Sequence, residues 1–355
     1  MDTRLTRLLG CRYPVIQTAM GWVADARLVA ATGNAGGFGF LAGAVMTPEE
    51  IESSIAEIQS LSDAPFGVNF HMYVPYAERI VDICIANGVR AVSYSRSPSP
   101  KTVEKLKAAG IICIPTVGAK RHAEKAVEMG ADALVIQGGE GGGHTGSVAT
   151  TILLPQVRAS VDVPIAAAGG FRDGNGLVAA LAMGADGIAM GTRFLLTEES
   201  PVPSVTKDVY LATPPEKIVV STKLDGLPQR MINNNYLGRL MTASQLGLLT
   251  RALKNGLAFR KLTGESLASV LGSAWRMYRS GDLSLGQTMM AANAPMMIQE
   301  AMVRGQPDNG ILPSGQVAGV IDDLPSVSTL MERIMSEANA RAREIASLSG
   351  EEEMK

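Results

Sequence analysis

Short runs of apolar residues recur through the first 200 positions, and they are continuous rather than alternating with polar residues. Continuous runs of this length are typical of parallel strands that are covered on both faces or that face a filled barrel. Eight such runs predict strands at 15–19, 38–43, 66–70, 91–95, 112–117, 133–138, 164–170 and 187–194.

Segments with helical start and stop signals separate these runs. Thr47-Pro48-Glu49-Glu50 begins a helix that is expected to reach Leu61, and a second helix in KTVEKLKAAG ends at Gly110. The spacing fits one βα unit per repeat, and a doubly wound sheet seldom contains eight such units. The pattern therefore predicts an α/β fold, a closed (β/α)8 TIM barrel.

The regular alternation stops after Phe194. Amphipathic patterns predict helices at 240–258 and 266–280, and a last one at about 325–348 that returns to pack on the barrel. We therefore expect a barrel made of 1–199 and 313–355, with 200–312 as a mostly helical insertion that covers the active-site face.

Composition restricts the class of protein. Of 355 residues, 46% are hydrophobic and 19% charged, and the formal net charge is −2. Such a chain is globular and offers no overall field for nucleic acid. It contains no apolar run of about 18 residues and no signal-peptide core, so we expect a cytoplasmic protein without a membrane partner. Cys11, Cys84 and Cys113 lack metal-ligand spacing, which predicts reduced thiols and no metal site.

The most unusual segment is GGEGGGHTG at 138–146, which follows the sixth predicted strand and contains His144. So many glycines suit a backbone that approaches a ligand closely, and a histidine held there suits proton abstraction near neutral pH. The alternative is a flexible turn with an incidental histidine.

Two further glycine signals lie at the ends of the seventh and eighth predicted strands, at 168–171 and 190–194. In these barrels the corresponding loops commonly bind a phosphate through backbone N–H groups. Arg193 either pairs with that phosphate or belongs to a structural ion pair.

Other residues offer weaker signals. Thr18, Ala19 and Met20, near the end of the first strand, and Asn69, at the end of the third, suit contacts to a flat ring. The alternatives are barrel filling for Met20 and an Asx turn for Asn69. His71 and His122 are expected to be surface residues. The methionines at 289–302 suit a core or an adaptable pocket. Basic residues of the insertion suit a solvated face or a nucleotide-tailed substrate: Arg251, Lys254, Arg260, Lys261, Arg276 and Arg279.

Six motifs together resemble those of the nitronate monooxygenase family, formerly called 2-nitropropane dioxygenases. That family in turn resembles flavin-dependent enoyl-acyl-carrier-protein reductases and NADH:quinone reductases. They are PVIQTAMGWV near the start, PFGVN at 65–69, VIQGGEGGGHTG at 135–146, PIAAAGGF at 164–171, AMGTRF at 189–194 and GILPSGQVAGVIDD at 310–323.

This resemblance implies an FMN-binding barrel, with NAD(P)H as one reductant it allows and a homodimer as one oligomeric state it allows. It assigns the FMN phosphate to Gly169, Gly170, Gly191 and Thr192. It assigns the ring and ribityl chain to Thr18, Ala19, Met20, Asn69, Gln137 and Gly143, with Ser314, Gly315 and Gln316 closing over them. His144 would be the base that takes a proton from the substrate.

Two departures from the family pattern bear on the substrate. Thr116 stands where some members carry lysine, and the insertion at about 224–300 has no counterpart in short nitronate enzymes. The insertion looks like a branch that acts on steroid-derived acyl-CoA compounds. We therefore expect an FMN-dependent oxidoreductase of nitronate monooxygenase type, which oxidises its substrate at flavin N5. The alternative is a flavin-dependent dehydrogenase or reductase of a steroid-derived acyl-CoA or enoyl thioester. A third hypothesis is a flavin-carrying or metabolite-sensing barrel without enzymatic activity.

Overall fold

The computed structural model describes residues 1–72, 74, 76–94, 99–242 and 294–348. Its contacts divide the chain into two compact units. The first comprises Met1–Gly141, Gly146–Pro201 and Ile321–Lys355, and the second comprises Gly142–Thr145 and Val202–Val320.

Eight parallel strands of the first unit close into a barrel, as the sequence predicted. In order around the barrel they are β1 (Val15–Gln17), β2 (Phe38–Leu41), β3 (Gly67–Asn69), β4 (Ala91–Tyr94), β5 (Ile112–Val117), β6 (Leu134–Gln137), β8 (Ile165–Ala168) and β9 (Gly187–Met190). The barrel closes where Val15 lies opposite Ile188 and Gln17 opposite Met190.

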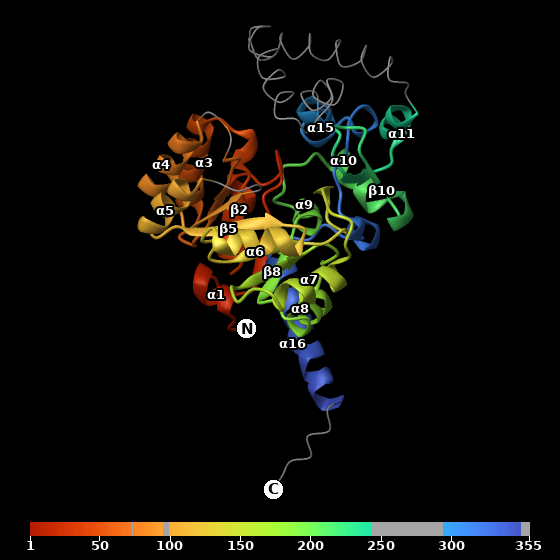
Figure 1. The fold of residues 1–355 in the computed structure, drawn as a ribbon. Coiled ribbons are helices and arrows are strands. Elements are labelled where there is room, and N and C mark those ends of the chain that lie inside the picture. Colours follow the sequence, from red (N-terminus) through yellow and green to blue (C-terminus); the bar gives the residue numbers. More distant parts are fainter. Residues whose placement is uncertain (73, 75, 95–98, 243–293, 349–355) are drawn as a thin grey trace. The chain divides into compact units, whose positions relative to one another are not determined.

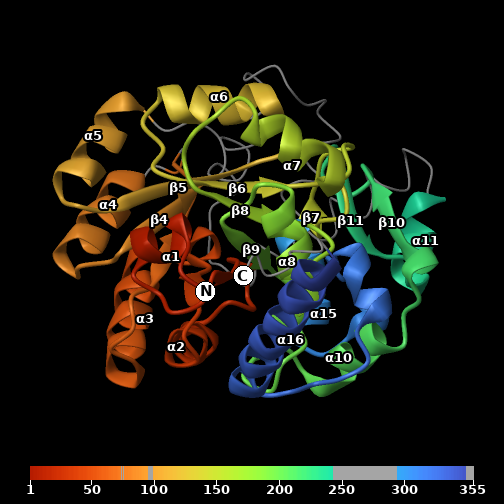
Figure 2. The ribbon, with the colours of Figure 1, turned by 90° about the horizontal axis from the view of Figure 1, so that it is seen from below.

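Alternating strand residues fill the barrel. Phe38 and Phe40 of β2 meet edge to face with their ring centroids 5.2 Å apart, and they belong to one buried cluster with Ala166, Ala168 and Ala189. The small alanines of β8 and β9 leave room for the two large rings. Leu5 and Leu9 of α1 belong to the same cluster, so α1 covers one end of the barrel (Figure 2).

Helices surround the strands (Figures 1 and 2). They are α1 (Arg4–Leu9), α2 (Ala26–Asn34), α3 (Pro48–Leu61), α4 (Ala77–Ala86), α5 (Pro100–Ala108), α6 (Lys120–Glu128), α7 (Thr150–Arg158), α8 (Gly174–Ala182), the short α9 (Thr192–Leu195) and α16 (Val327–Leu348), with the 3-10 turn η1 (Gly43–Val45). The predicted start at Thr47 is a capping box, in which Thr47 and Glu50 each accept the other's backbone N–H.

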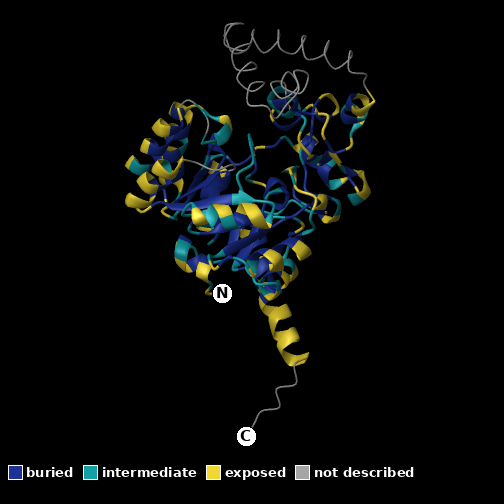
Figure 3. Cartoon of the chain, viewed as in Figure 1, coloured by how far each residue is buried: buried dark blue, intermediate teal, exposed yellow. Residues whose placement is uncertain are grey.

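The last helix, α16, completes the barrel after the chain returns from the second unit. It packs between α8 and α2, which is the position of the eighth helix. Its first half buries Leu330, Met331, Ile334 and Ala338, whereas every residue from Asn339 to Leu348 is exposed (Figure 3). The predicted return of this segment onto the barrel is confirmed.

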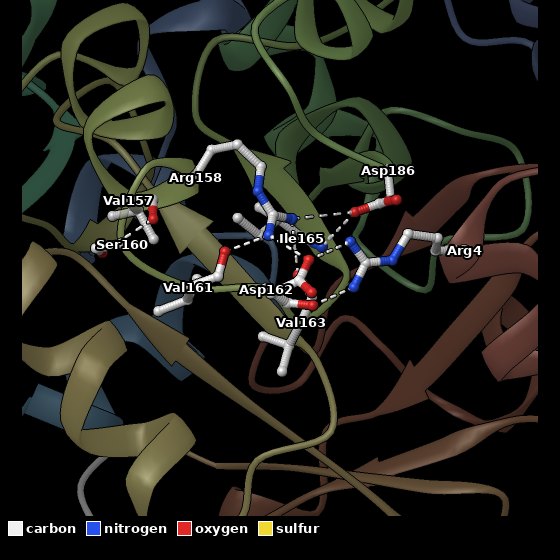
Figure 4. A network of polar contacts seen from close by, with 9 residues as sticks. All are labelled: Arg4, Val157, Arg158, Ser160, Val161, Asp162, Val163, Ile165 and Asp186. Carbon is white, nitrogen blue, oxygen red and sulfur yellow. Dashed lines mark hydrogen bonds and ion pairs between the residues drawn. The ribbon is translucent and has the colours of Figure 1, made fainter.

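A polar network lies where the last two barrel strands begin (Figure 4). Arg158 of α7 donates to the carbonyls of Val161 and Val163, and Asp186 accepts the N–H of Ile165 at 2.9 Å. These contacts join the α7–β8 connection to the start of β9. This end of the barrel is opposite to the one that carries active sites in this fold, so we assign the network to stability.

The second unit contains a three-stranded antiparallel sheet in the order β10-β11-β7. Its strands are β7 (Gly143–His144), β10 (Ile218–Ser221) and β11 (Gln229–Ile232). Its described helices are α10 (Ser204–Leu211), α11 (Asn235–Met241) and α15 (Ala294–Met302), with 3-10 turns η2 (Pro215–Lys217), η3 (Pro307–Asn309) and η4 (Gln316–Val320). Most of the helical patterns predicted at 240–258 and 266–280 lie outside the described residues.

Candidate active site

Strand ends of the barrel carry most of the residues expected to bind a cofactor. β1, β3, β6, β8 and β9 end at or directly before them: Thr18, Ala19, Met20, Asn69, Gln137, Gly169, Gly170, Gly191 and Thr192. Because all strands of a closed parallel barrel point the same way, these residues share its carboxyl edge.

Hydrogen bonds between neighbouring strand ends fix this edge. The Thr18 N–H donates to the Met190 carbonyl at 3.0 Å, and the Asn69 side-chain amide donates to the Ser93 carbonyl at 3.0 Å. The first contact joins the end of β1 to that of β9, and the second joins the end of β3 to that of β4. The first contact therefore fixes the backbone at Thr18, and the second fixes the side chain of Asn69 itself.

The glycines of the edge have conformations or surroundings that exclude larger residues. Gly169 and Gly170 have φ values of +100° and +83°, a region that favours glycine. A Cβ on Gly191 would lie 3.1 Å from the Thr18 hydroxyl oxygen and 3.3 Å from the Met20 sulfur. The two loops thus form a cradle of bare backbone, which suits a phosphate group.

Glu140, within the glycine-rich segment, holds that segment against the Gly169 turn. Its carboxylate accepts the Thr150 hydroxyl at 2.8 Å and the Thr150 N–H at 3.0 Å, which caps the start of α7. The same Thr150 oxygen lies 3.1 Å from the Gly169 carbonyl. Sequence reasoning did not single out Glu140, although its place among glycines was a signal.

In the second unit His144 is fixed by two residues of the β10–β11 hairpin. β7 pairs with β11, so that His144 lies opposite Gln229. The His144 Nε2 lies 2.7 Å from Asp225 Oδ2, and the same oxygen accepts the Gln229 amide at 2.6 Å. The side chain of His144 is 59% exposed and that of Asp225 10% exposed. A ring that faces solvent is therefore held from behind by a buried carboxylate.

The Asp225 carboxyl is charged at neutral pH. Burial on its own raises its pKa, but hydrogen bonds from His144, Gln229 and the Leu227 N–H, together with the charge of His144, outweigh burial and hold the pKa below its usual value. Neither Asp225 nor Gln229 was found from the sequence, because no local spacing relates them to a histidine 81 and 85 residues earlier, respectively. The Asp225-Gly226 pair signals only a turn.

Residues 314–316 lie beside β7, along the same edge of β11. The Ser314 N–H donates to the Arg230 carbonyl at 3.2 Å, and Arg230 also lies opposite Gly143. A Cβ on Gly142 would lie 2.5 Å from the Gly315 nitrogen, so the two backbones meet there. The second unit thus brings together Gly143, His144, Ser314 and Gly315, with Gln316 at the start of η4.

The structure decides several alternatives left by the sequence. The side chain of Arg193 is buried in an ion pair with Asp323 at 2.6 Å, so it belongs to a structural pair. His71 is half-buried and His122 is exposed on α6. Met297 and Met302 of α15 lie in the core. Met289, Met290 and the basic residues from Arg251 to Arg279 lie outside the described residues.

Within the described part of the chain, no group of three or more His, Cys, Asp or Glu residues could hold a metal ion. None of the described helices is long and apolar enough to span a bilayer. All three cysteines are free, and Cys84 and Cys113 are buried.

The chain is similar to several known proteins. A family model described as nitronate monooxygenase matches residues 2–78 and 68–337. A curated Rhodococcus jostii protein is 46% identical over 98% of this chain and 99% of its own length. It is named (3aS,4S,5R,7aS)-5-hydroxy-7a-methyl-1-oxo-octahydro-1H-indene-4-carboxyl-CoA dehydrogenase. A probable nitronate monooxygenase of Staphylococcus saprophyticus is 30% identical over 68% of this chain and 81% of its own length.

Solved structures show the same fold. FabK from Thermotoga maritima has a TM-score of 0.79 and 29% identity, over 98% of this chain and 99% of its own. Nitroalkane oxidase from Streptomyces ansochromogenes has a TM-score of 0.76 and 25% identity, over 97% of this chain and 100% of its own. The names of the Rhodococcus, Staphylococcus and Streptomyces proteins are those of a dehydrogenase, a monooxygenase and an oxidase, respectively. FabK shares the fold of this chain.

Proposed function

The chain belongs to the nitronate monooxygenase family and is an oxidoreductase, and on that premise we propose that it is an FMN-dependent dehydrogenase of a bulky acyl-CoA. In this proposal His144 takes the proton α to the thioester. Family membership supports a flavin, and the identification of that flavin as FMN belongs to the proposal.

The carboxyl edge of the barrel suits the phosphate of FMN. We assign that phosphate to Gly169, Gly170, Gly191 and Thr192, because the left-handed glycines and the cradle at Gly191 present bare backbone after the last two barrel strands, where this fold commonly binds a phosphate. The ring and ribityl chain are assigned to Thr18, Ala19, Met20, Asn69, Gln137 and Gly143, with Ser314, Gly315 and Gln316 closing over them. When bound, the flavin supplies a two-electron acceptor.

His144 supplies the base. The C–H α to a thioester is a weak carbon acid, as is the α C–H of a nitroalkane, so one positioned imidazole serves either substrate. The proton passes to the ring of His144. The β-carbon of the acyl-CoA gives up its hydrogen with two electrons to the acceptor, and an α,β-unsaturated thioester results. Only residues 138–143 separate the end of β6 from His144, so the base is close in sequence to the carboxyl edge of the barrel.

The full-length likeness to acyl-CoA dehydrogenases carries the choice of substrate. Identity of 46% extends over 98% of this chain, whereas the Staphylococcus saprophyticus nitronate monooxygenase covers 68%. Because the insertion is expected to provide substrate contacts, a relative that matches nearly the whole chain is the better guide. In this proposal, the final electron acceptor is a nicotinamide or oxygen.

Nitronate oxidation is the second candidate. It is favoured by the His144 motif and by the family model, whose description names that activity. It needs the same base and the same flavin, so only the substrate distinguishes the two.

An anaerobic titration of the flavin-loaded protein tests both. We expect the visible flavin absorbance to bleach with the bicyclic acyl-CoA named for the Rhodococcus jostii relative, and not with the nitronate of nitroethane. Bleaching by the nitronate alone would overturn the acyl-CoA proposal and support the second candidate. Reoxidation by NAD⁺, by NADP⁺ or by oxygen, measured next, identifies the acceptor.

Three further expectations remain predictions of the sequence. They are the covering of the barrel face by the insertion, a homodimer and a cytoplasmic location. Analytical ultracentrifugation tests the homodimer directly.

A further inference from the structure

We propose that Asp225 is the positioning residue of His144: its buried carboxylate fixes the imidazole in the Nε2–H form and balances the positive charge that the ring gains with the substrate proton. This inference rests on the proposed function, in which His144 is the base. It assigns a role to a residue 81 positions away that no motif marks.

The carboxylate is itself rigidly held. Its Oδ1 accepts the Leu227 N–H at 3.0 Å, within the turn that Asp225 begins, and its Oδ2 accepts the Gln229 amide at 2.6 Å. Gln229 is 3% exposed and its backbone belongs to β11, which pairs with β7. The same sheet therefore carries both His144 and Gln229, the residue that holds the Asp225 carboxylate.

The geometry sets the tautomer. The ionised carboxylate can only accept, so Gln229 must present its amide nitrogen and His144 must present Nε2–H to the same Oδ2. The Gln229 amide nitrogen also lies 3.1 Å from His144 Nε2, to which it could donate in the other tautomer. In that tautomer, however, the Nε2 lone pair would face the negative charge of Asp225 at 2.7 Å, so the carboxylate favours Nε2–H. A neutral ring that carries its proton on Nε2 has its lone pair on Nδ1.

Burial makes the pair effective. The Asp225 side chain is 10% exposed, so water screens its charge poorly, and the imidazolium formed during proton transfer meets a full negative charge at hydrogen-bond distance. The 59% exposure of His144 lets the opposite side of the ring be reached by a ligand. Serine hydrolases use the same arrangement, in which a buried carboxylate orients a catalytic histidine.

Nuclear magnetic resonance tests the tautomer without any activity. The chain contains three histidines, so ¹⁵N-histidine labelling with the His71→Gln and His122→Gln variants assigns every ring. In the flavin-loaded protein we expect the Nε2–H form of His144. In Asp225→Asn the new amide can donate to Nε2, and we expect the ring to change to the Nδ1–H form. An unchanged Nε2–H form in Asp225→Asn would overturn the inference.

Kinetics test the consequence for the reaction. Asp225→Asn should slow anaerobic flavin reduction by the acyl-CoA about a hundredfold or more, with KM within about twofold, because the ring is held in the wrong tautomer. The exposed Asp308→Asn in the same unit is the matched control and should keep the normal rate. Equal rates for Asp225→Asn and Asp308→Asn would also overturn the inference.

Two more variants separate the possible failures. His144→Ala should lose the reaction, and adding Asp225→Asn to it should lower the rate no further, because the two residues act as one unit. A fully active His144→Ala would overturn the proposed function instead. If Asp225→Asn does not fold, Gln229→Leu is the substitute, because it removes one hydrogen-bond donor from the Asp225 carboxylate. We expect Gln229→Leu to lose less of the rate than Asp225→Asn, with KM unchanged. A normal rate for this variant would count against the inference.

Discussion

The guanidinium of Arg193 lies 2.6 Å from the carboxylate of Asp323, 130 residues further along the chain. Arg193 follows the Gly191 loop at the end of β9, and Asp323 belongs to the segment that returns to the barrel. The other carboxylate oxygen of Asp323 binds Arg333 of α16. One aspartate therefore ties the expected phosphate loop to the returning segment and its helix.

We expect Asp323→Asn to destabilise the barrel by about 3 kcal/mol, since it removes the opposite charge from the buried Arg193 and leaves it only backbone carbonyls. Urea denaturation of the flavin-free protein measures this. The matched control is Asp2→Asn, because the Asp2 side chain is 74% exposed in its pair with Arg7, and we expect almost no change there. Equal stability of the two variants would contradict the anchoring role.

The same pair predicts a pH dependence. Burial alone raises the pKa of the Asp323 carboxyl, but hydrogen bonds and charges from Arg333 and Arg193 hold it below its usual value. A carboxyl with a lowered pKa contributes stability that is fully present above its unfolded pKa, about 3.9, and is lost as the pH falls through its folded pKa. The stability difference between wild type and Asp323→Asn should therefore be constant near neutrality and shrink below about pH 4.

Gly169→Ala should weaken flavin binding at least about tenfold. Its φ of +100° strains any other residue, and the new Cβ would lie 2.9 Å from the Thr150 hydroxyl oxygen, so the turn must move. Fluorescence titration of the flavin-free protein measures the affinity. Gly88→Ala is the control, because Gly88 has a φ of +63° with open space around it, on the connection before β4. It should lose stability but bind flavin normally.

Gly174→Ala should destabilise the docking of α16 by about 3 kcal/mol or more. A Cβ there would lie 2.3 Å from the backbone of Ala338 and Ile334, which cannot move without displacing the helix. Gly176→Ala, in the same helix, would meet the Phe171 ring at 3.2 Å and gains helix propensity, so its stability should change little. Thermal unfolding of the two variants compares them, and equal midpoints would rule out the close α8–α16 contact.

The cysteines should resist alkylation at pH 8. Burial raises the pKa of Cys84 and Cys113 to about 12 and that of Cys11 to about 11, so almost no thiolate is present. Mass spectrometry after a short iodoacetamide pulse should find unmodified native protein and three labelled thiols in urea. Rapid labelling of native Cys84 would show that the helix layer opens.

The barrel could be predicted from the sequence because its signals are local. Each strand buried on both faces is a short continuous apolar run, so the predicted and observed strands agree within a few residues, as for 112–117 and β5. The helix start at Thr47-Pro48-Glu49-Glu50 is equally local, since a capping box is formed by residues three apart. Because parallel strands of a barrel end on one side, the glycines after β8 and β9 could also be placed on the active-site edge.

The sequence by itself thus determined the barrel, its carboxyl edge and the glycine-rich segment with His144. Tertiary structure alone decided which groups surround those residues: Asp225 and Gln229 contact His144, and Asp323 pairs with Arg193. It also decided that β7 joins a sheet with β10 and β11, two strands that lie within the region 200–312 expected to be mostly helical. β7 is two residues long and gains its partners from a hairpin about 80 residues away, so no local pattern encodes it. Periodicity records which face of an element is buried, whereas the partner of a polar side chain is chosen only when distant segments meet.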